Sequence, residues 1–453
     1  MVPRVSPIEL AVMAVRAAMR EGATEAEAFV TRRRGYSVSI LAGRIKGLES
    51  MDEAGVGIRV AVGKRVGFAY ATGLDTEAAR RAARAAVKQA RASPEDPYWP
   101  GLPEPPERYP EPSGVYGDGV ARASPESIVE DAKVLIGHVA AREGVQLSRA
   151  SIGVSVFEEA IANSNGVYAV EMGTYASVMV SIVVQKNGLT TPAVFEFESS
   201  RVAVPDVTAV ANRAVEKALL ATKVVKGLQP GRYTVVYQPQ VLAELLDYTV
   251  LSSLNGENVV RGRSYYVGKT GGKVMDERIT IIDDGLLKGG DSTGRFDGEG
   301  VPMQTTVLVE KGVLRGFIYD NYWASRVGTR STGNAVRSGY SSRPRPGFTN
   351  IVIPGGDAGP EELYEGRVLV IYQVQGAHTA NPETGEYSVL ANPAILYENG
   401  EPKGWVPGLV LAGNLYKELA ENVEAISKWT EKPYPGAVLP AMRLRGVSAA
   451  PRG

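Results

Sequence analysis

The chain has 453 residues, of which 44% are hydrophobic, with 50 basic and 50 acidic residues and no cysteine. This length is typical of about two to four domains with their own cores, and the lack of cysteine excludes disulfides, thiolate metal ligands and a cysteine nucleophile. Zero net charge without a basic stripe argues against direct nucleic-acid binding. Because the N-terminus lacks a signal-peptide core and no apolar run approaches the roughly 18 residues of a membrane span, we expect a cytoplasmic protein without membrane contact.

Helices and strands are mixed along the first half of the chain. Ser6-Pro7 is typical of a helix N-terminus, since serine accepts free amide hydrogens and proline has none to satisfy. Apolar and polar residues alternate over 36–40, which indicates a half-buried strand. Further helices are predicted over 75–91, from Ser124 and over 206–222, and further strands on both sides of Gly63-Lys64 and around 153–166 and 174–188.

Two segments of the first half connect or border these elements. Residues 93–116 are rich in proline, which fixes φ and donates no hydrogen bond, so they are predicted to be an extended surface connector. The basic run Arg32-Arg33-Arg34 is expected to lie at a solvated sheet edge, where charges discourage aggregation.

The second half is predicted to be rich in strands. After a boundary near Gly227, a strand over 233–237 precedes a helix from Pro239 to about Leu254. Apolar runs separated by glycine-rich turns follow, with hairpins at Lys311-Gly312 and Asn399-Gly400. The sequence therefore predicts an α+β fold with helices packed on largely antiparallel sheets, divided into residues 1–226 and a strand-rich domain of residues 227–453.

Metal-ligand patterns are sparse. A catalytic zinc ion takes three protein ligands, most often histidines, two of which share a helix face. The only histidines are His138 and His378, which are 240 positions apart. His138 lies in a predicted helix beside apolar residues and is expected to be structural. His378 lies in a polar loop between two predicted strands, where functional residues are common.

Two other motifs favour a structural interpretation. Ser292 lies in a G-x-S-x-G pattern, but a nucleophile elbow needs a helix after the serine, and none is predicted here. An acidic cluster follows no regular calcium-loop spacing, and aspartate is common in turns, so we predict turns. Its members are Asp283, Asp284, Asp291, Asp297 and Glu299.

Five motifs, in order, resemble the TldD/PmbA family, once called modulators of DNA gyrase. An Asn-Ser-x-Gly turn at 163–166 precedes a Ser/Thr-rich strand pair. An Asp-x-Glu-Gly turn at 297–300 precedes a Gly-Val-Leu hairpin and a Ser-Thr-Gly-Asn loop at 331–334. A Thr-Gly-Glu-aromatic strand begins at Thr384. The similarity in order and spacing extends over nearly the whole chain.

The resemblance implies two kinds of chain, of which only one binds the catalytic metal. TldD-type members carry an H-E-x-x-x-H helix that binds the catalytic metal, and PmbA-type (TldE-like) members lack it. The corresponding helix here, after residue 238, has no histidine, and the C-terminal cysteine of TldD-type chains is absent. The resemblance thus implies a subunit without catalytic or metal-binding residues, in a heteromeric zinc metallopeptidase that trims or degrades unfolded or modified peptides. A TldD-like partner would hold the zinc, and any link to gyrase would be indirect, through proteolysis.

A subunit without a metal site can still contribute a peptide groove, because strand edges bind extended peptides through backbone hydrogen bonds. We hypothesise that the polar loops 329–347 and 375–388 line this groove. The candidate residues are Thr332, Asn334, Arg337, His378, Asn381, Thr384 and Glu386.

Two alternatives stay open at this point. The chain could be a stand-alone hydrolase that forms a homodimer, with His378 and a carboxylate such as Glu383 or Glu386 in a metal site shared across a two-fold axis. It could instead be a chaperone-like protein that only binds peptides.

Overall fold

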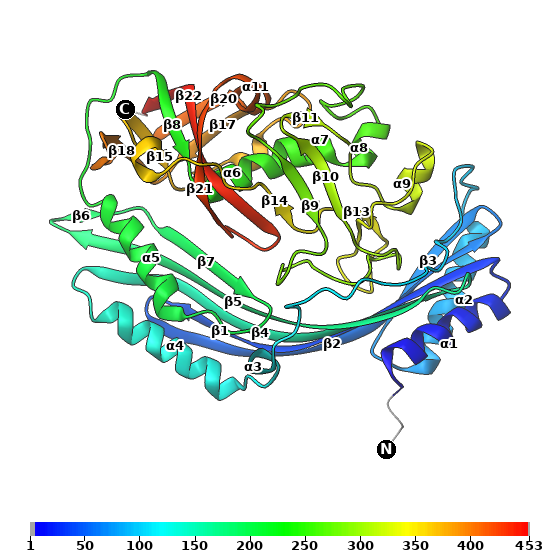
Figure 1. Ribbon diagram of the computed structural model, residues 1–453. Helices are drawn as coiled ribbons and strands as arrows, with labels where there is room; N and C mark the ends of the chain where they lie inside the picture. The colour runs from blue at the N-terminus through cyan, green and yellow to red at the C-terminus, as the bar shows by residue number, and fades with distance from the viewer. Residues whose placement is uncertain (1–4, 452–453) are drawn as a thin grey trace.

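Two sheets organise the chain in the computed structural model, which describes residues 5–451 (Figure 1). The first half forms a curved seven-stranded sheet and the second half a thirteen-stranded sheet. The predicted α+β class is confirmed, and most strand pairs are antiparallel. The division predicted between residues 226 and 227 falls in the segment that joins the two halves, and stays a prediction. Among the described residues, no helix is long and apolar enough to cross a membrane.

The described part of the first half, from residue 5 onward, contains five helices and seven strands. In chain order they are α1 (Pro7–Arg20), β1 (Glu25–Leu41), β2 (Arg44–Val62), β3 (Arg65–Thr72), α2 (Thr76–Ala92), α3 (Asp118–Ala121), α4 (Pro125–Ala140), β4 (Val145–Asn163), β5 (Tyr168–Lys186), β6 (Leu189–Thr190), β7 (Val194–Ser200) and α5 (Val207–Leu220).

Local signals placed α1, α2, α4 and α5 and the turn at Asn165-Gly166 correctly, whereas the short α3 was not predicted. Ser6 forms a capping box with Glu9 at the start of α1, and Ser124 caps α4. The turn between β4 and β5 contains Gly166 at φ +104°, a conformation that favours glycine. The strands were underestimated, because β1, β2, β4 and β5 are 17 to 19 residues long. Their polar stretches hide the alternation that marks a strand.

The expectation for Arg32-Arg33-Arg34 was wrong. These residues lie on β1, which pairs with β2 on one side and β4 on the other, so they are not at a sheet edge. Arg33 donates from Nε to the Ser155 hydroxyl at 3.2 Å, and Arg32 pairs with Asp52 at 3.5 Å. The side-chain partners of these arginines lie on the neighbouring strands β2 and β4, and a run of three arginines does not by itself indicate which strands are neighbours.

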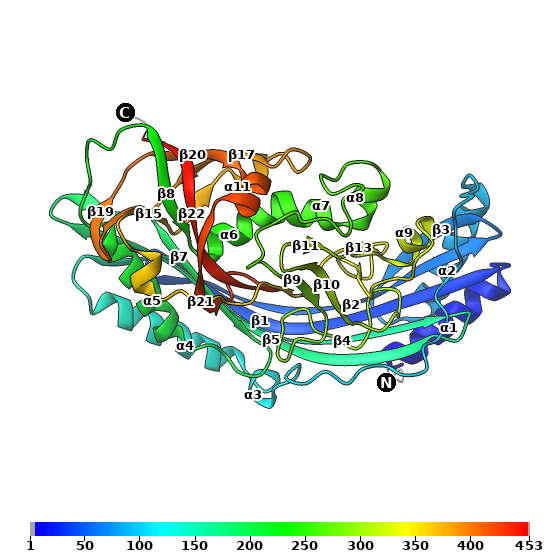
Figure 2. The same cartoon turned by 45° about the horizontal axis from the view of Figure 1, so that its top comes forward.

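The second half lies over the concave side of the curved sheet (Figures 1 and 2). Its helices are α6 (Pro239–Leu246), the π-helical turn η1 (Asp247–Leu251), α7 (Ser252–Leu254), α8 (Gly256–Val260), α9 (Asn321–Arg326), α10 (Pro360–Leu363), the 3₁₀ turn η2 (Ala377–Thr379) and α11 (Leu415–Glu421). Its strands are β8 (Gly231–Tyr237), β9 (Ile281–Asp284), β10 (Thr305–Glu310), β11 (Val313–Leu314), β12 (Ala335–Val336), β13 (Arg345–Pro346), β14 (Ile351–Val352), β15 (Arg367–Ile371), β16 (Val374–Gln375), β17 (Glu386–Ala391), β18 (Ala394–Glu398), β19 (Glu401–Trp405), β20 (Leu409–Asn414), β21 (Val423–Glu431) and β22 (Ala437–Pro451).

Strand β22 is the central strand of the second sheet, although the sequence did not predict it. It pairs with β8, β14, β20 and β21, so both of its edges are used. Pro440 and Gly446 interrupt the pattern from which a strand would be predicted. The predicted hairpins at Lys311-Gly312 and Asn399-Gly400 are confirmed, with all four residues at positive φ.

A buried ion network joins the two halves. Arg59 of β2 donates to Glu27 of β1 at 2.7 Å and to Glu299 of the second half at 2.8 Å. Arg337 donates to the other oxygen of Glu27 and, from Nε, to the carbonyl of Gly298 at 2.7 Å. The side chains of the four charged residues are at most 7% exposed. Two of the three ion pairs, Arg59–Glu299 and Arg337–Glu27, therefore exist only while the halves remain in contact.

Beside this network, Asp297 caps a turn, as predicted for the acidic cluster, whereas Asp283 and Asp284 of that cluster end strand β9 and not a turn. The carboxylate of Asp297 accepts backbone N–H groups of Glu299, Val301 and Ala335 at 2.8, 3.0 and 3.0 Å. Burial and the nearby charge of Glu299 nevertheless raise the pKa of Asp297 to about 8.

We predict that Arg59→Met lowers the free energy of unfolding by about 3–5 kcal/mol, because it leaves buried Glu299 without its cation and Glu27 with Arg337 alone. Urea unfolding followed by circular dichroism measures the change. Arg80→Met is the control: Arg80 forms an exposed pair with Glu77, and losing it should cost under about 1 kcal/mol. Similar losses in both variants would contradict the role of the network.

The raised pKa of Asp297 predicts a pH dependence of stability. The folded chain holds this proton up to about pH 8, whereas an unfolded aspartate releases it near a pKa of about 3.9. The free energy of unfolding should therefore fall as pH rises between these values. In Asp297→Asn this fall should be smaller by at least about 1 kcal/mol from about pH 5 to about pH 8, as measured by urea unfolding. Equal slopes would mean that the three amides keep Asp297 ionised.

Candidate functional site

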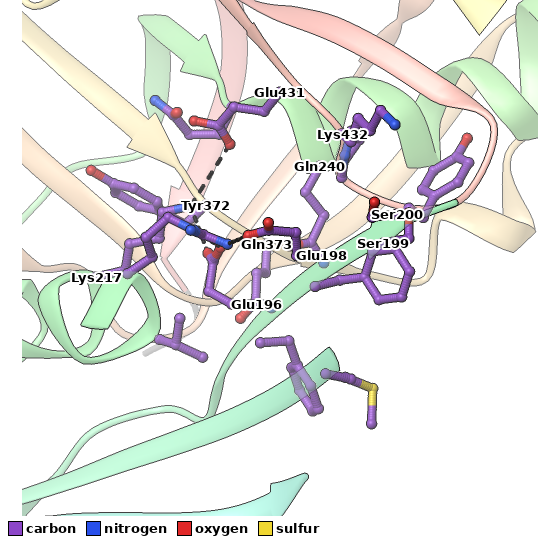
Figure 3. Close-up of a pocket in the computed structure, with 18 residues that line it drawn as sticks. Glu196, Glu198, Ser199, Ser200, Lys217, Gln240, Tyr372, Gln373, Glu431 and Lys432 are labelled. Carbon is purple, nitrogen blue, oxygen red and sulfur yellow. Dashed lines mark hydrogen bonds and ion pairs between the residues drawn. The ribbon is translucent and has the colours of Figure 1, made fainter. Parts of the chain in front are cut away.

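A cleft of about 800 Å³ lies between the two halves (Figure 3). The first half contributes all seven residues of β7, together with Arg213 and Lys217 of α5. The second half contributes the start of α6, Tyr372 and Gln373 after β15, and residues 431–434 at the end of β21 and just beyond it. The cleft therefore exists only when the two sheets are assembled against each other.

One wall of the cleft is the outer edge of β7. On its inner side β7 pairs with β5, and no strand of residues 5–451 pairs with its outer side. The N–H of Phe195 points outward, toward Gln373. Alternate residues of a strand direct their backbone N–H and C=O groups to the same edge. The N–H and C=O groups of Phe197 and Ser199 therefore also point outward. An unpaired edge of this kind can accept an extended chain as an additional strand.

Gln373 already occupies the first position along this edge. With its amide oriented to satisfy both neighbours, Nε2 donates to the carbonyl of Ala193 at 3.1 Å and Oε1 accepts from the N–H of Phe195 at 3.0 Å. The residue Gln373 is 6% exposed. The amide thus makes the two hydrogen bonds that a paired strand would make, and the edge is free from there onward.

Most of the charged residues that line the cleft form ion pairs with one another, and the lining has no net charge. Lys217 contacts Glu196 of β7 at 2.6 Å and Glu431 of the second half at 4.0 Å (Figure 3). Arg213 contacts Glu198 at 2.5 Å. With Lys432, the lining contains three acidic and three basic side chains. Such balance suits a neutral peptide backbone better than a highly charged ligand.

Arg201, directly after β7, fixes this wall to the second half. It donates to the carbonyls of Gly290, Asp291 and Thr293 at 3.1–3.3 Å, and from Nε to Thr174 at 2.6 Å. Its residue exposure is 3%, and this burial lowers its pKa. The far end of the β7 edge is therefore held rigidly.

The helix after β8 forms the opposite side of the cleft. Gln240 donates to the carboxylate of Glu244 at 3.2 Å, and burial raises the pKa values of Glu244 and Asp247. From Asp247 the helix continues as the π-turn η1, a feature frequent at functional sites. Among residues 5–451, no three His, Cys, Asp or Glu side chains are placed to hold a metal ion. The donor set here does not fit a catalytic zinc ion.

The predicted loop 375–388 is exposed beside this helix. His378 is exposed on η2, and its ring meets that of Tyr248 edge to face, with centroids 6.4 Å apart. Asn381 accepts the backbone N–H groups of Glu383 and Thr384, and Thr384 donates to Glu386 at 3.3 Å. The four candidates of this loop thus lie together on the surface, and their role in binding stays a prediction.

The candidates of the loop 329–347 lie in a different place. Asn334 is 1% exposed and donates to Asp283 at 2.6 Å, while Thr332 donates to Asn334 at 2.7 Å. Burial raises the pKa of Asp283 to about 6. Arg337 belongs to the buried ion network. These three side chains are occupied within the chain, so the structure does not bring them together with His378 in one cavity lining.

Two further sequence motifs have structural partners. His138 of α4 is hydrogen-bonded to Asn212 of α5 at 2.8 Å, which joins two helices of the first half. The backbone N–H of Ser292 donates to Asn350 at 3.0 Å, and the residue lies in a turn rather than before a helix. Neither arrangement is that of a hydrolase nucleophile and its base.

The β7 edge is the part of the site that the sequence interpretation missed. The sequence does contain a strand pattern here, because Phe195 and Phe197 alternate with Glu196 and Glu198. This alternation is typical of a strand with one apolar and one polar face. Whether that strand is paired on both sides depends on distant segments.

Comparison with known proteins gives three family models that match in order. They are PmbA/TldA metallopeptidase domain 1 over residues 26–90, the PmbA/TldA metallopeptidase central domain over 119–222 and the PmbA/TldA metallopeptidase C-terminal domain over 230–451. An uncharacterized protein of Methanocaldococcus jannaschii is 33% identical, over 86% of this chain and 89% of its own. A metalloprotease TldD homolog of Haemophilus influenzae is 27% identical, over 80% and 77%.

Solved structures share the whole fold. The crystal structure of TldE from Thermococcus kodakarensis is 31% identical and superposes with a TM-score of 0.90, over 96% of this chain and 98% of the other. A putative modulator of a DNA gyrase from Thermotoga maritima, at 22% identity, gives a TM-score of 0.86 over 98% and 99%. At 22% identity, the similarity to the Thermotoga maritima structure shows a shared fold and nothing further.

Proposed function

This chain belongs to the PmbA/TldD metallopeptidase family, and from that membership we propose that it is the TldE-like subunit of a heteromeric zinc peptidase. In this proposal a TldD-like partner holds the zinc, and the present chain contributes the binding surface for an extended, unfolded or modified peptide. The observation that carries the proposal is the open outer edge of β7 in a charge-balanced cleft, in a chain whose corresponding helix lacks zinc ligands.

The chemistry of the cleft supports binding rather than bond cleavage by this chain. Backbone N–H and C=O groups at Phe197 and Ser199 can pair with any peptide, irrespective of its sequence, if the peptide is extended. Most segments of a folded protein have their backbone groups already paired and cannot add as a strand. The edge therefore selects for unfolded segments, while hydrolysis needs a metal-activated water that the partner would supply.

The exposed residues of loop 375–388 are proposed as a second contact for the peptide or the partner. His378 lies next to the helix that corresponds to the zinc-binding helix of TldD-type chains, and it has an exposed imidazole. Asn381 and Thr384 are already partly engaged in their own turn. Of the seven candidates, these loop residues are the ones still accessible to another molecule.

We expect zinc to divide unequally between the two chains. This chain, purified alone, should contain close to no zinc by elemental mass spectrometry, and should not hydrolyse peptides. Mixed with a TldD-like chain, it should form a complex that contains zinc and cleaves unstructured peptides. About one zinc per chain or per two chains in this protein alone would contradict the proposal and favour a shared His378 site. Peptide binding without any activity in the complex would favour the chaperone-like alternative.

The β7 edge can be tested by removing one backbone donor. Phe197→Pro deletes an outward N–H, which an edge strand tolerates, whereas Phe197→Val removes the ring but keeps the N–H. Loss of one or two hydrogen bonds should raise KM for peptide hydrolysis by the assembled complex about tenfold in the proline variant only. Size-exclusion chromatography checks that both variants still assemble. Equal KM values in the two variants would contradict peptide pairing at β7.

A further inference from the structure

A second cavity, of about 460 Å³, lies between the concave face of the curved sheet and the second half. Strands β1, β2, β4 and β5 contribute its floor, and residues 291–292, 337–341 and Pro435 contribute its roof. No described residue lines both this cavity and the β7 cleft. Between the two spaces, Ser199 of the cleft donates to Asp291 of the cavity at 2.9 Å. We call this space the Arg33 cavity, and its volume is that of a small-molecule site.

The Arg33 cavity contains charged side chains that the fold does not use. Its lining includes three basic and three acidic residues, which are Arg32, Arg33, Arg337, Glu53, Glu159 and Asp291. Arg32 pairs with Asp52 at 3.5 Å, and Arg337 belongs to the buried ion network. Asp291 accepts the hydroxyl of Ser199. The other three have no ion pair with any residue of 5–451.

Arg33 is the free cation of this cavity. Its Nε and Nη2 donate to the hydroxyl of Ser155 at 3.2 and 3.1 Å, and Ser155 is buried, so the guanidinium is held in place. Its Nη1 donates to no acceptor within the described chain, and the residue is exposed. A guanidinium held from one side can donate from its other side to a carboxylate.

Glu159 is the free anion of the same floor. Arg33 of β1 lies opposite Phe157 of β4, and Glu159 follows two residues later on the same face. The Glu159 carboxylate makes no hydrogen bond within residues 5–451, although the residue is half-buried. Burial and the charge of Glu171 raise the pKa of Glu159 to about 7. A cation brought by a ligand would stabilise its ionised form.

The spacing of these two groups suits a short peptide. Diagonal neighbours on one face of an antiparallel pair lie about 7–8 Å apart, and Arg33 leans along β4 toward Ser155, away from Glu159. An extended peptide of two or three residues spans about 7–10 Å, whereas a single amino acid spans about 3.5 Å and would not reach both groups. The remaining lining includes the apolar surfaces of Phe157 and Tyr340.

We propose that the Arg33 cavity binds a peptide of two or three residues by both of its free ends. The terminal carboxylate accepts from Arg33, the terminal ammonium donates to Glu159, and apolar side chains pack against Phe157 and Tyr340. Glu53 is exposed on β2, where water screens its charge, so it is the weaker partner for the ammonium.

This site differs from the proposed groove in what it recognises. The β7 edge pairs with the backbone in the middle of a long chain, whereas the Arg33 cavity requires two free ends a short distance apart. The inference rests on the charges of the cavity and goes beyond the proposed function, so the two proposals can fail separately.

Isothermal titration calorimetry of the purified chain with the tripeptide alanyl-leucyl-alanine tests the site. Two blocked forms test its ends: the C-terminal amide lacks the negative charge, and the N-acetyl form lacks the positive charge. Each blocked form should bind at least about tenfold more weakly than the free tripeptide, because each leaves one charged group of the cavity without its partner. Pairing along β7 would not distinguish the three peptides, since it uses backbone groups alone.

Substitutions assign the two ends. In Arg33→Gln the free tripeptide and its amide should bind equally, and in Glu159→Gln the free and acetylated forms should bind equally. Arg34→Gln is the matched control: the next side chain along β1 leaves from the opposite face and lines a different cavity. This variant should bind all three peptides like the wild type.

Circular dichroism checks that each variant is folded. No binding of the free tripeptide to the wild-type chain, or equal affinities for the free and blocked forms, overturns the proposal. A preference for free ends that persists in both Arg33→Gln and Glu159→Gln overturns the assignment of these two residues.

Discussion

The contact on which this structure depends is the buried ion network of Glu27, Arg59, Glu299 and Arg337. Two carboxylates and two guanidinium groups share one almost water-free space, where each would be costly without the others. Two of the four come from the curved sheet and two from loops of the second half. The halves therefore cannot slide or separate without leaving buried charges uncompensated, which makes their relative position a fixed property of the fold.

Close backbone contact accompanies this electrostatic constraint. Tyr340 of the second half lies against Gly55 and Gly57 of β2, where a Cβ atom would come within 2.4 Å of its side chain and 2.1 Å of its carbonyl oxygen. Arg201 makes a similar connection near β7. The β7 cleft, next to Arg201, is thus preformed, and a peptide that pairs with β7 would not have to organise its own site.

The outer edge of β7 suits a single extended peptide of variable sequence, because its lining is balanced in charge and enclosed by the second half. Natural sheets usually protect such edges. Here the amide of Gln373 already fills the first position along the edge.

The sequence by itself determined what depends on neighbouring residues. Helix caps such as Ser6 and Ser124, the hairpin turns and the lack of histidine after β8 are local properties, and they led to the α+β class and to a family resemblance. Tertiary structure decided which strand edges stay open and which polar residues are buried. Asn334 and Arg337 looked like candidates for a groove but bond to Asp283 and Glu27, the latter 310 positions away in the chain. Burial and pairing are set by such distant partners, and no local pattern encodes them.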